Sequence, residues 1–443
     1  MDRNGKELNR TMGVATGVSI VIGTVIGSGI FFKQAEVLTK AGGPTQGLMA
    51  WIIGGLITLA AGLTIAEVGA RIPETGGIYV YIGQLYGKFW GFLTGWTQVA
   101  IYAPGIVAAL ASYFALLFAS FFGISTARVP WIALVTIALI AGMNSLENRI
   151  PSAFQVATTS IKLIPIAGLI IFGIFFGKEH ALNHAITVAS SSNSGNLGMA
   201  ILATLFAYDG WATLTNLGGE LKNPRKTIPR SIIIGILVVM LAYVGVSYGV
   251  YRSLPANEIV RLGDNVPYKV AITAFGNLGG RLLSIGIMIS MLGTLNGKML
   301  AFPRMVFAMA EDGFLPRAFA KLNRYQEPFM ALWITAGLGM GLVFTAAANW
   351  LSDMVVFIIW MFYLAVFVGI FKLRMQSKRA GLNDDPEIFQ VPLYPIIPLI
   401  AIAGAIFIGV NTLLSEFTMV MTSFVFVIIG IPVYFYYAHK NKN

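Results

Sequence analysis

The sequence contains no cysteine and only three histidines. The missing cysteine excludes disulfide bonds, thiolate metal sites and cysteine nucleophiles, and with them a disulfide-linked partner subunit. His180 and His184 lie in a polar stretch and His439 lies near the C-terminus, so we expect neither a histidine metal site nor any cofactor. Charged residues are also scarce: they make up 11% of the chain, against about 25% in a soluble domain. The composition therefore predicts an integral membrane protein.

Long apolar stretches recur along the whole chain. Each is about 20 residues long, the length that crosses the hydrocarbon core as a helix. Between them, 79–88 is too short to span and is expected to be interfacial or re-entrant, while 255–279 is expected to be an outer loop with short helices. The pattern predicts an all-α membrane protein with about twelve transmembrane helices, at 12–38, 46–70, 89–118, 131–147, 152–177, 198–221, 229–251, 280–309, 328–347, 350–374, 393–414 and 417–438.

Lysine and arginine outnumber the acids, which gives a net charge of +11. Because this excess follows the predicted topology, it does not indicate nucleic-acid binding. With segment 1–11 in the cytoplasm, about 20 basic residues lie in cytoplasmic segments and about 8 lie outside, as the positive-inside rule requires. An even number of spans then places the tail, 439–443, on the same side, so we expect both termini in the cytoplasm.

The first apolar stretch is interrupted by Gly27-Ser28-Gly29. Each glycine costs about 1 kcal/mol relative to alanine inside a helix, and hydrocarbon cannot satisfy backbone groups that leave the helix. A break here is therefore tolerable if the freed groups line a cavity and bind a small polar solute, because a half-helix N-terminus attracts a carboxylate. The alternative is a small-residue packing motif, since Gly23 and Gly27 form a G-x-x-x-G pattern.

A second interruption, Phe206-Ala207-Tyr208-Asp209-Gly210-Trp211, lies in the sixth apolar stretch. Five spans precede it, so the second half of the chain starts from the opposite side of the membrane. Two broken helices at corresponding positions of two halves are typical of a transporter with an inverted repeat, whose substrate binds at the midplane between them. We expect a first repeat at 12–177, an inverted second repeat at 198–374, and two further helices in 393–438.

Two motifs resemble a known family. Gly23-Thr24-Val25-Ile26-Gly27-Ser28-Gly29-Ile30-Phe31 resembles the first-helix signature of the amino acid–polyamine–organocation superfamily. The second interruption, followed by Gly219-Glu220-Leu221-Lys222-Asn223-Pro224, resembles the sixth-helix signature of its L-type amino acid transporter family. Residues 201–224 and 293–304 are especially similar to bacterial serine/threonine exchangers within that family.

The resemblance implies a leucine-transporter-like fold, with a five-plus-five inverted repeat, discontinuous helices 1 and 6, and two extra C-terminal helices. It implies sodium-independent exchange of small neutral L-amino acids (serine, threonine, alanine or cysteine) by alternating access in a bacterial cell membrane. Eukaryotic relatives pair with a heavy subunit through a cysteine, which this chain lacks. A proton-coupled amino acid symporter with the same fold is the alternative.

Two other classes of function are disfavoured by the residues themselves. A membrane-embedded enzyme needs clustered histidine, cysteine or acids at membrane depth, and Asp209 is the one plausible mid-membrane acid. A channel is disfavoured because no ring of repeated filter residues is present and the paired breaks favour occlusion of a substrate. The chain is therefore predicted to be a transporter and not an enzyme.

The first break is expected to bind the two charged ends of an amino acid. The N–H groups of Gly27, Ser28 and Gly29 and the Ser28 hydroxyl are expected to hold the α-carboxylate. The carbonyls of Val25 and Ile26 are expected to hold the ammonium. The resemblance matches Ser28 and Gly29 to the carboxylate contacts of the family.

The second break is expected to face the same cavity. The carbonyls of Phe206, Ala207 and Asp209 suit the ammonium, and the resemblance matches Phe206 to an aromatic gate that closes over the substrate; ordinary packing is its alternative. The Asp209 side chain has three candidate roles: it caps the second half of the helix, contacts the substrate side chain, or titrates and couples protons. The cap is favoured because glycine follows Asp209 where the helix restarts.

Lys162 lies about ten residues into the fifth span, where a lysine costs about 2.5–3.5 kcal/mol on insertion scales. By resemblance, its ammonium replaces the sodium of related transporters and bridges the broken first helix to the eighth. The alternatives are snorkelling to an interface and proton coupling. Tyr243 matches a family tyrosine near the site. Asn296 and Lys298 are expected to line the inner pathway or to lie near its cytoplasmic end.

Overall fold

The computed structural model describes residues 10, 12–147, 149–177, 195–345, 348–379, 381 and 388–440. Most of the N-terminal segment 1–11, the two histidines predicted in a polar stretch (His180 and His184) and the last three residues of the tail lie outside the described residues. Within these ranges the regular structure is helical, apart from one isolated parallel bridge between Met12 and Leu221.

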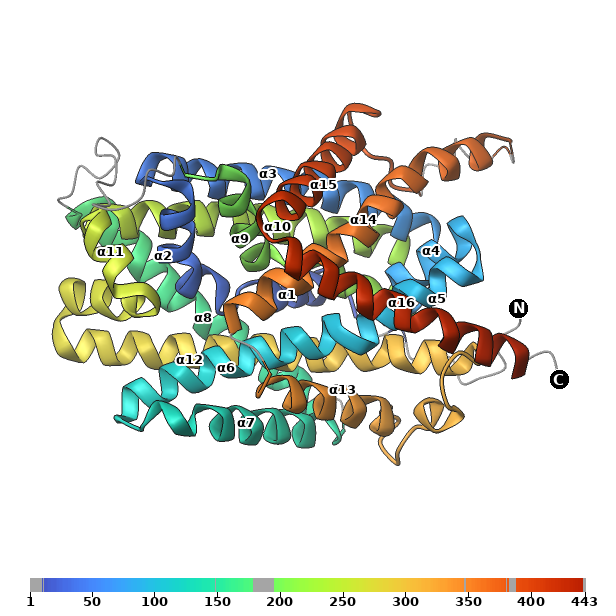
Figure 1. Ribbon diagram of the computed structural model, residues 1–443, viewed down its shortest axis with the longest axis horizontal. Helices are drawn as coiled ribbons and strands as arrows, with labels where there is room; N and C mark the ends of the chain where they lie inside the picture. Colours follow the sequence, from blue (N-terminus) through green and yellow to red (C-terminus); the bar gives the residue numbers. More distant parts are fainter. Residues whose placement is uncertain are drawn as a thin grey trace.

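The described helices run roughly along the long axis of the molecule in Figure 1 and form one bundle. Their bounds are α1 Val14–Val25, α2 Gly29–Ala41, α3 Pro44–Arg71, α4 Ile78–Tyr86, α5 Lys88–Thr97, η1 Gln98–Tyr102, α6 Ala103–Phe122, η2 Thr126–Arg128, α7 Val129–Asn144, α8 Arg149–Phe176, α9 Leu197–Tyr208, η4 Trp211–Glu220, α10 Pro224–Ser253, α11 Ala256–Leu262, η5 Gly263–Asn265, α12 Val266–Glu311, η6 Arg317–Ala320, α13 Phe329–Leu342, α14 Ala348–Arg379, α15 Ile396–Ser415 and α16 Phe417–Lys440.

Among the described residues, ten helical segments are long and apolar enough to cross a membrane, and α1 with α2 makes an eleventh bent by 46°. The all-α membrane fold is thereby confirmed. The remaining predicted span, 328–347, contains the 14-residue helix α13, which is about 21 Å long at 1.5 Å per residue. This is short of the roughly 30 Å hydrocarbon core, so within the described residues α13 is the shortest of the predicted spans.

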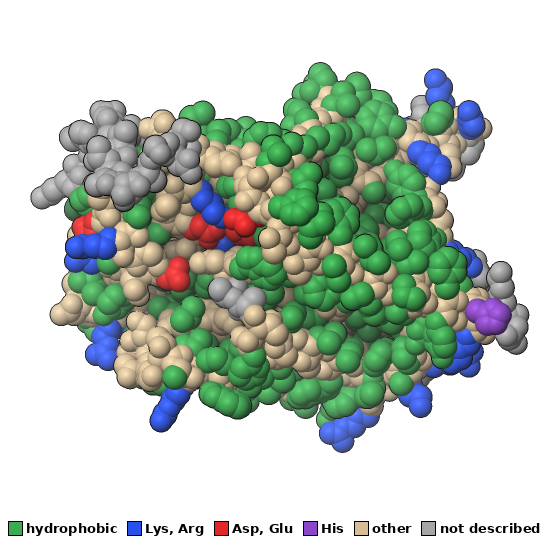
Figure 2. Space-filling view, in the orientation of Figure 1, with side chains coloured by type: hydrophobic (Ala, Val, Ile, Leu, Met, Phe, Trp, Pro, Cys, Tyr) green, Lys and Arg blue, Asp and Glu red, His purple; other side chains and the backbone are tan. Residues whose placement is uncertain are grey.

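Apolar side chains cover the outside of the bundle, as a bilayer requires. Leu139, Ile164, Leu241 and Phe175 are each 68–74% exposed, and Figure 2 shows apolar side chains over the middle of this face with most charged ones toward its two ends. The broken segment formed by α9 and η4 is instead buried over almost its whole length. The two interruptions therefore lie inside the protein, where backbone groups can leave a helix without meeting lipid.

Two clusters of ion pairs mark the two ends of the bundle. We call the end with Met12, Arg71, Glu220 and Arg374 the Met12 face, and the end with Lys40 and Asp353 the Lys40 face. Backbone bonds join Met12 to η4, and the Gly219 N–H donates to the Thr75 hydroxyl beyond α3, which links the groups of the Met12 face. That face lies at the right of Figure 1, where α16 ends.

Candidate functional site

The first break lies between Val25, where α1 ends, and Gly29, where α2 begins. The Ile26 N–H still bonds to Ile22, but within the described residues no acceptor is found for the N–H groups of Gly27, Ser28 and Gly29. Ser28 is fully buried, and its Oγ has no hydrogen-bond partner in the part of the chain that the structure describes. Since a buried polar group without a partner costs about 1–3 kcal/mol, these unpaired donors indicate a place where a ligand binds.

The second break lies at Asp209 and Gly210, between α9 and the 3-10 helix η4. Gly210 has φ of +129°, a conformation suited to glycine, and a Cβ there would lie 2.6 Å from the Thr24 carbonyl oxygen. The Thr24 hydroxyl in turn donates to the Gly210 carbonyl at 3.1 Å. The two breaks therefore touch each other directly, although they are far apart in the sequence.

A small cavity lies between the two breaks and contains about 250 Å³ of space not occupied by protein atoms, including space open to solvent. Six predicted substrate residues line it: Val25, Gly27, Ser28, Gly29, Phe206 and Asp209. The other lining residues, which the sequence did not identify as substrate contacts, are Thr24, Ile106, Leu110, Thr294 and Lys298.

Glycines at the first break also allow close packing. A Cβ on Gly23 would lie 2.3 Å from the Gln155 Nε2 of α8, and one on Gly27 would lie 2.9 Å from the Thr294 Cγ2 of α12. These glycines therefore also serve as a small-residue packing motif, which was the alternative interpretation. The helix break and the close packing occur together.

Asp209 forms a buried ion pair with Lys298 of α12, at 2.7 Å between Oδ2 and Nζ. Both carboxylate oxygens also lie 2.9 Å from the Tyr102 hydroxyl, which donates to them from the end of η1. The predicted cap is wrong: Gly210 occupies the N-cap position of η4, and no side chain caps it. The Asp209 carboxylate accepts instead from Lys298, whose opposite charge offsets the cost of burying it.

Tyr243 joins the two broken helices from α10. Its hydroxyl lies 3.0 Å from the carbonyl oxygen of Val25 and 3.0 Å from that of Ala207, and donates its one proton between them. These are the last turns of α1 and α9, whose carbonyls have no partner further along the helix. The predicted position of Tyr243 beside the site agrees with these contacts.

Lys162 is fully buried and its ammonium lies under the first break. The Nζ donates to the carbonyls of Gly23 at 2.8 Å and Ile26 at 2.5 Å, and to the Thr294 hydroxyl of α12 at 3.2 Å. These contacts are the bridge between the first and eighth helices that the resemblance implied. Snorkelling to an interface is contradicted, because the side chain is enclosed by α1 and α12.

The Ile26 carbonyl already accepts several hydrogen bonds from the protein itself. Besides Lys162, it accepts from the hydroxyls of Thr294 at 2.7 Å and Ser290 at 3.3 Å. A carbonyl oxygen has two lone pairs, so this group has no capacity left for a substrate ammonium. Ile26 therefore positions α1 and is not the ammonium ligand that the sequence predicted.

Asn296 lies away from the cavity. Its amide nitrogen donates to the Pro151 carbonyl at 3.0 Å and the Gln155 Oε1 at 2.9 Å, and its oxygen accepts from Asn144 at 2.8 Å. It joins α7, α8 and α12 and is fully buried. The prediction that Asn296 lines the inner pathway is wrong, because its polar atoms form hydrogen bonds with these three neighbours.

Ion pairs close the Lys40 face above the cavity. The Lys33 Nζ lies 2.6 Å from Glu36 and 2.9 Å from Asp353 of α14, and Lys40 contacts the same two acids. The Lys33 Nζ also lies 5.3 Å from the centre of the Phe206 ring, which lines the cavity. The sequence did not indicate this cluster.

Ion pairs close the Met12 face as well. Glu67 of α3 is fully buried and binds Arg71 at 2.8 Å and Arg374 of α14 at 2.6 Å. On the other side of this face, Arg304 of α12 contacts Glu220 at 3.5 Å and Glu327 at 2.8 Å. Ion pairs between buried or half-buried side chains thus occur at both faces of the bundle.

Comparisons with known proteins agree with this geometry. The chain matches the amino acid permease family over residues 13–438. It is 41% identical to the serine/threonine exchanger SteT of Bacillus subtilis (strain 168), over 97% of each chain. It is 30% identical to the large neutral amino acids transporter small subunit 2 of Mus musculus, covering 99% of this chain and 83% of the relative.

A further relative is the Asc-type amino acid transporter 1 of Mus musculus, at 28% identity over 97% of this chain and 81% of the relative. These matches confirm the resemblance drawn from the two interrupted motifs, and they identify a transporter, not an enzyme. The chain is a multi-pass membrane protein that belongs to the amino acid permease family.

Proposed function

We propose that the chain is a sodium-independent exchanger of small neutral L-amino acids such as serine, threonine, alanine and cysteine. The named activities of the relatives, a serine/threonine exchanger and an Asc-type transporter, support this substrate class. The observation that carries the proposal is the buried, unpartnered Ser28 hydroxyl beside three free N–H groups in the central cavity.

The substrate carboxylate binds at the first break. The N–H groups of Gly27, Ser28 and Gly29 and the Ser28 hydroxyl donate to its oxygens, and the N-terminus of α2 favours negative charge there. The ammonium binds to the carbonyls at the second break, of which Phe206 and Ala207 are the candidates, with Val25 facing them. The Val25 and Ala207 carbonyls share one donor, Tyr243, so each keeps capacity for a second.

The remaining walls favour a small, neutral side chain. Ile106 and Leu110 narrow the cavity on the α6 side. The charge of Asp209 is already compensated by Lys298, so the cavity offers no net charge to a cationic or anionic side chain. Bulky and charged amino acids are therefore expected to be poor substrates.

Lys162 takes the place of a coupling ion. An ammonium that already links the carbonyls of Gly23 and Ile26 to Thr294 leaves no requirement for sodium at this position. Opening alternates between the faces as the ion-pair clusters at Lys33 and at Arg304 separate in turn, and Phe206 closes over the bound amino acid.

The topology follows the same proposal. Residues 12–177 and 198–374 form the two inverted repeats, 393–438 adds two helices, and both termini lie in the cytoplasm of a bacterial cell. The chain acts without a disulfide-linked heavy subunit, because it has no cysteine to form that bond.

Exchange is tested with purified protein in vesicles free of sodium. We expect labelled serine to enter vesicles preloaded with unlabelled serine, and to enter empty vesicles at least about tenfold more slowly, because the empty carrier does not return. Uptake into empty vesicles that requires an inward proton gradient would contradict exchange and favour the proton-coupled symporter.

A further inference from the structure

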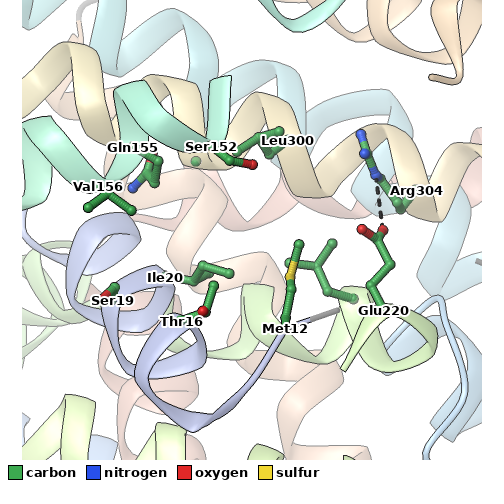
Figure 3. A pocket seen from close by; sticks show the side chains of 12 residues that line it. Met12, Thr16, Ser19, Ile20, Ser152, Gln155, Val156, Glu220, Leu300 and Arg304 are labelled. Carbon is green, nitrogen blue, oxygen red and sulfur yellow. Dashed lines mark ion pairs between the residues drawn. The ribbon is translucent and has the colours of Figure 1, made fainter. Parts of the chain in front are cut away.

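A second hollow lies between the central cavity and the Met12 face. It contains about 560 Å³ of space not occupied by protein atoms, including space open to solvent, between α1, α8, η4 and α12. Figure 3 shows its walls, with Ile20 and Thr16 on α1, Gln155 and Ser152 on α8, and Glu220 with Arg304 at one end. We call this hollow the vestibule.

Only a thin barrier separates the vestibule from the central cavity. Thr24 lines the central cavity and Gly297 lines the vestibule. The two residues are in contact, because a Cβ on Gly297 would lie 2.7 Å from the Thr24 Cγ2. An amino acid that leaves the first break toward the Met12 face, past Thr24, enters the vestibule directly.

The far end of the vestibule carries complementary charges. The Arg304 Nε lies 3.5 Å from the Glu220 Oε1, and its Nη2 lies 2.8 Å from the Glu327 Oε2. Among the described residues, neither of these two oxygens has a hydrogen bond of ordinary geometry. Glu220, the more distant acid, is the more loosely held, so the guanidinium and this carboxylate can exchange partners with a ligand.

The near end of the vestibule carries an unsatisfied donor. Gln155 is only 3% exposed, and among the described residues its Nε2 has no hydrogen-bond partner. Figure 3 shows the amide on the side of α8 that faces α1, and Nε2 lies close to both Gly23 and Gly297. A buried amide without a partner next to a hollow indicates that a polar ligand reaches this point.

We infer that the vestibule is a second, weaker binding site for the same zwitterionic amino acids, occupied during transfer between the central cavity and the Met12 face. The carboxylate binds to Arg304, the ammonium binds to Glu220, and the Gln155 amide guides the substrate across the Thr24–Gly297 barrier. Apolar walls from Ile20, Leu217 and Leu300 complete the site, as is usual for small-molecule pockets. This inference rests on the proposed function.

Equilibrium binding of labelled serine to the purified full-length protein tests it. We expect two sites per chain in the wild type, one after Ser28→Leu, which fills the central cavity, and one after Arg304→Gln. The double variant should bind none. Arg324→Gln, which removes an exposed arginine beyond α12, is the matched control and should retain both sites.

A second measurement does not depend on counting sites. Because the chain has no cysteine, Ser152→Cys introduces a single thiol in the vestibule. In the Ser28→Leu background, serine should slow its reaction with a thiol reagent at least about threefold, whereas Ser125→Cys, at the exposed position before η2, should react at an unchanged rate.

The outcomes separate this inference from the proposed function. The vestibule site is overturned if the wild type binds serine at one site and Arg304→Gln keeps that site. It is also overturned if serine does not slow the reaction of the Ser152→Cys thiol. Neither result affects the proposed exchange. Wild-type protein that neither binds nor exchanges serine overturns the proposed function itself. If Ser28→Leu does not fold, the number of serine sites in the wild type and in Arg304→Gln decides whether the vestibule binds serine.

Discussion

Lys162→Met is expected to slow serine exchange by about 10- to 100-fold, since an unsatisfied buried carbonyl costs about 1–3 kcal/mol and each 1.4 kcal/mol is tenfold. Methionine keeps the length of the side chain but removes the ammonium that holds Gly23 and Ile26 of α1 against α12. The hydroxyls of Thr294 and Ser290 then support the break without the ammonium, and the Gly23 carbonyl keeps only its contact with Thr294. The rate of exchange in preloaded vesicles measures the effect.

The matched control for Lys162 is Lys321→Met, which removes a lysine of the same charge from an exposed position beyond α12. It should exchange at the wild-type rate. Both proteins should be compared with sodium and with choline, since the wild type is expected to be indifferent to the change. A Lys162→Met protein that exchanges normally, or a wild type that requires sodium, would contradict the role given to this ammonium.

Breaking the Asp209–Lys298 pair is expected to have a similarly large effect. Removing one partner of a buried ion pair costs about 3–5 kcal/mol, because the other charge remains buried and uncompensated. Lys298→Met should therefore lower the midpoint of thermal unfolding strongly. It should also admit cationic amino acids as competitors of serine, because the Asp209 carboxylate then faces the cavity unpaired.

A double-mutant cycle isolates this pair. Asp209→Asn combined with Lys298→Met should be less destabilised than the sum of the single variants, because neither charge is left alone. Lys269→Met is the control: its pairing with Glu258 is 3.9 Å long and 44% exposed on the lysine side, where ion pairs contribute about 0–1 kcal/mol. Additive single effects would show that Asp209 and Lys298 do not stabilise each other.

The two helix breaks could be predicted because their residues are unfavourable in a membrane-spanning helix. Gly27-Ser28-Gly29 and Asp209-Gly210 place poor helix formers within long apolar stretches, and a membrane leaves few ways to satisfy the freed backbone. Lys162 was recognisable for the same reason, since a charge at that depth requires partners. The family resemblance gave only the bridge between the first and eighth helices. The specific partners, Gly23, Ile26 and Thr294, are seen only in the structure.

The partners of Asp209 could not be predicted in the same way. A helix that is apolar on all sides gives no periodicity from which its inward face can be read, so nothing in α12 indicated that Lys298 faces Asp209 while Asn296 faces α8. Tyr102 lies at the end of the π-helical turn η1, whose register an α-helical pattern does not give. The cap predicted for Asp209 was a local interpretation, and a tertiary ion pair overrides it.

Recognition of the amino acid backbone by the two breaks is tested most directly by competition in the exchange assay. Serine, serinamide and N-acetylserine carry the same side chain, but serinamide lacks the carboxylate and N-acetylserine lacks the ammonium. We predict that alanine and threonine compete with labelled serine. Both modified serines should fail to compete even at a concentration about tenfold higher. Serinamide that competes as well as serine would contradict carboxylate binding at Gly27, Ser28 and Gly29, and with it the central claim.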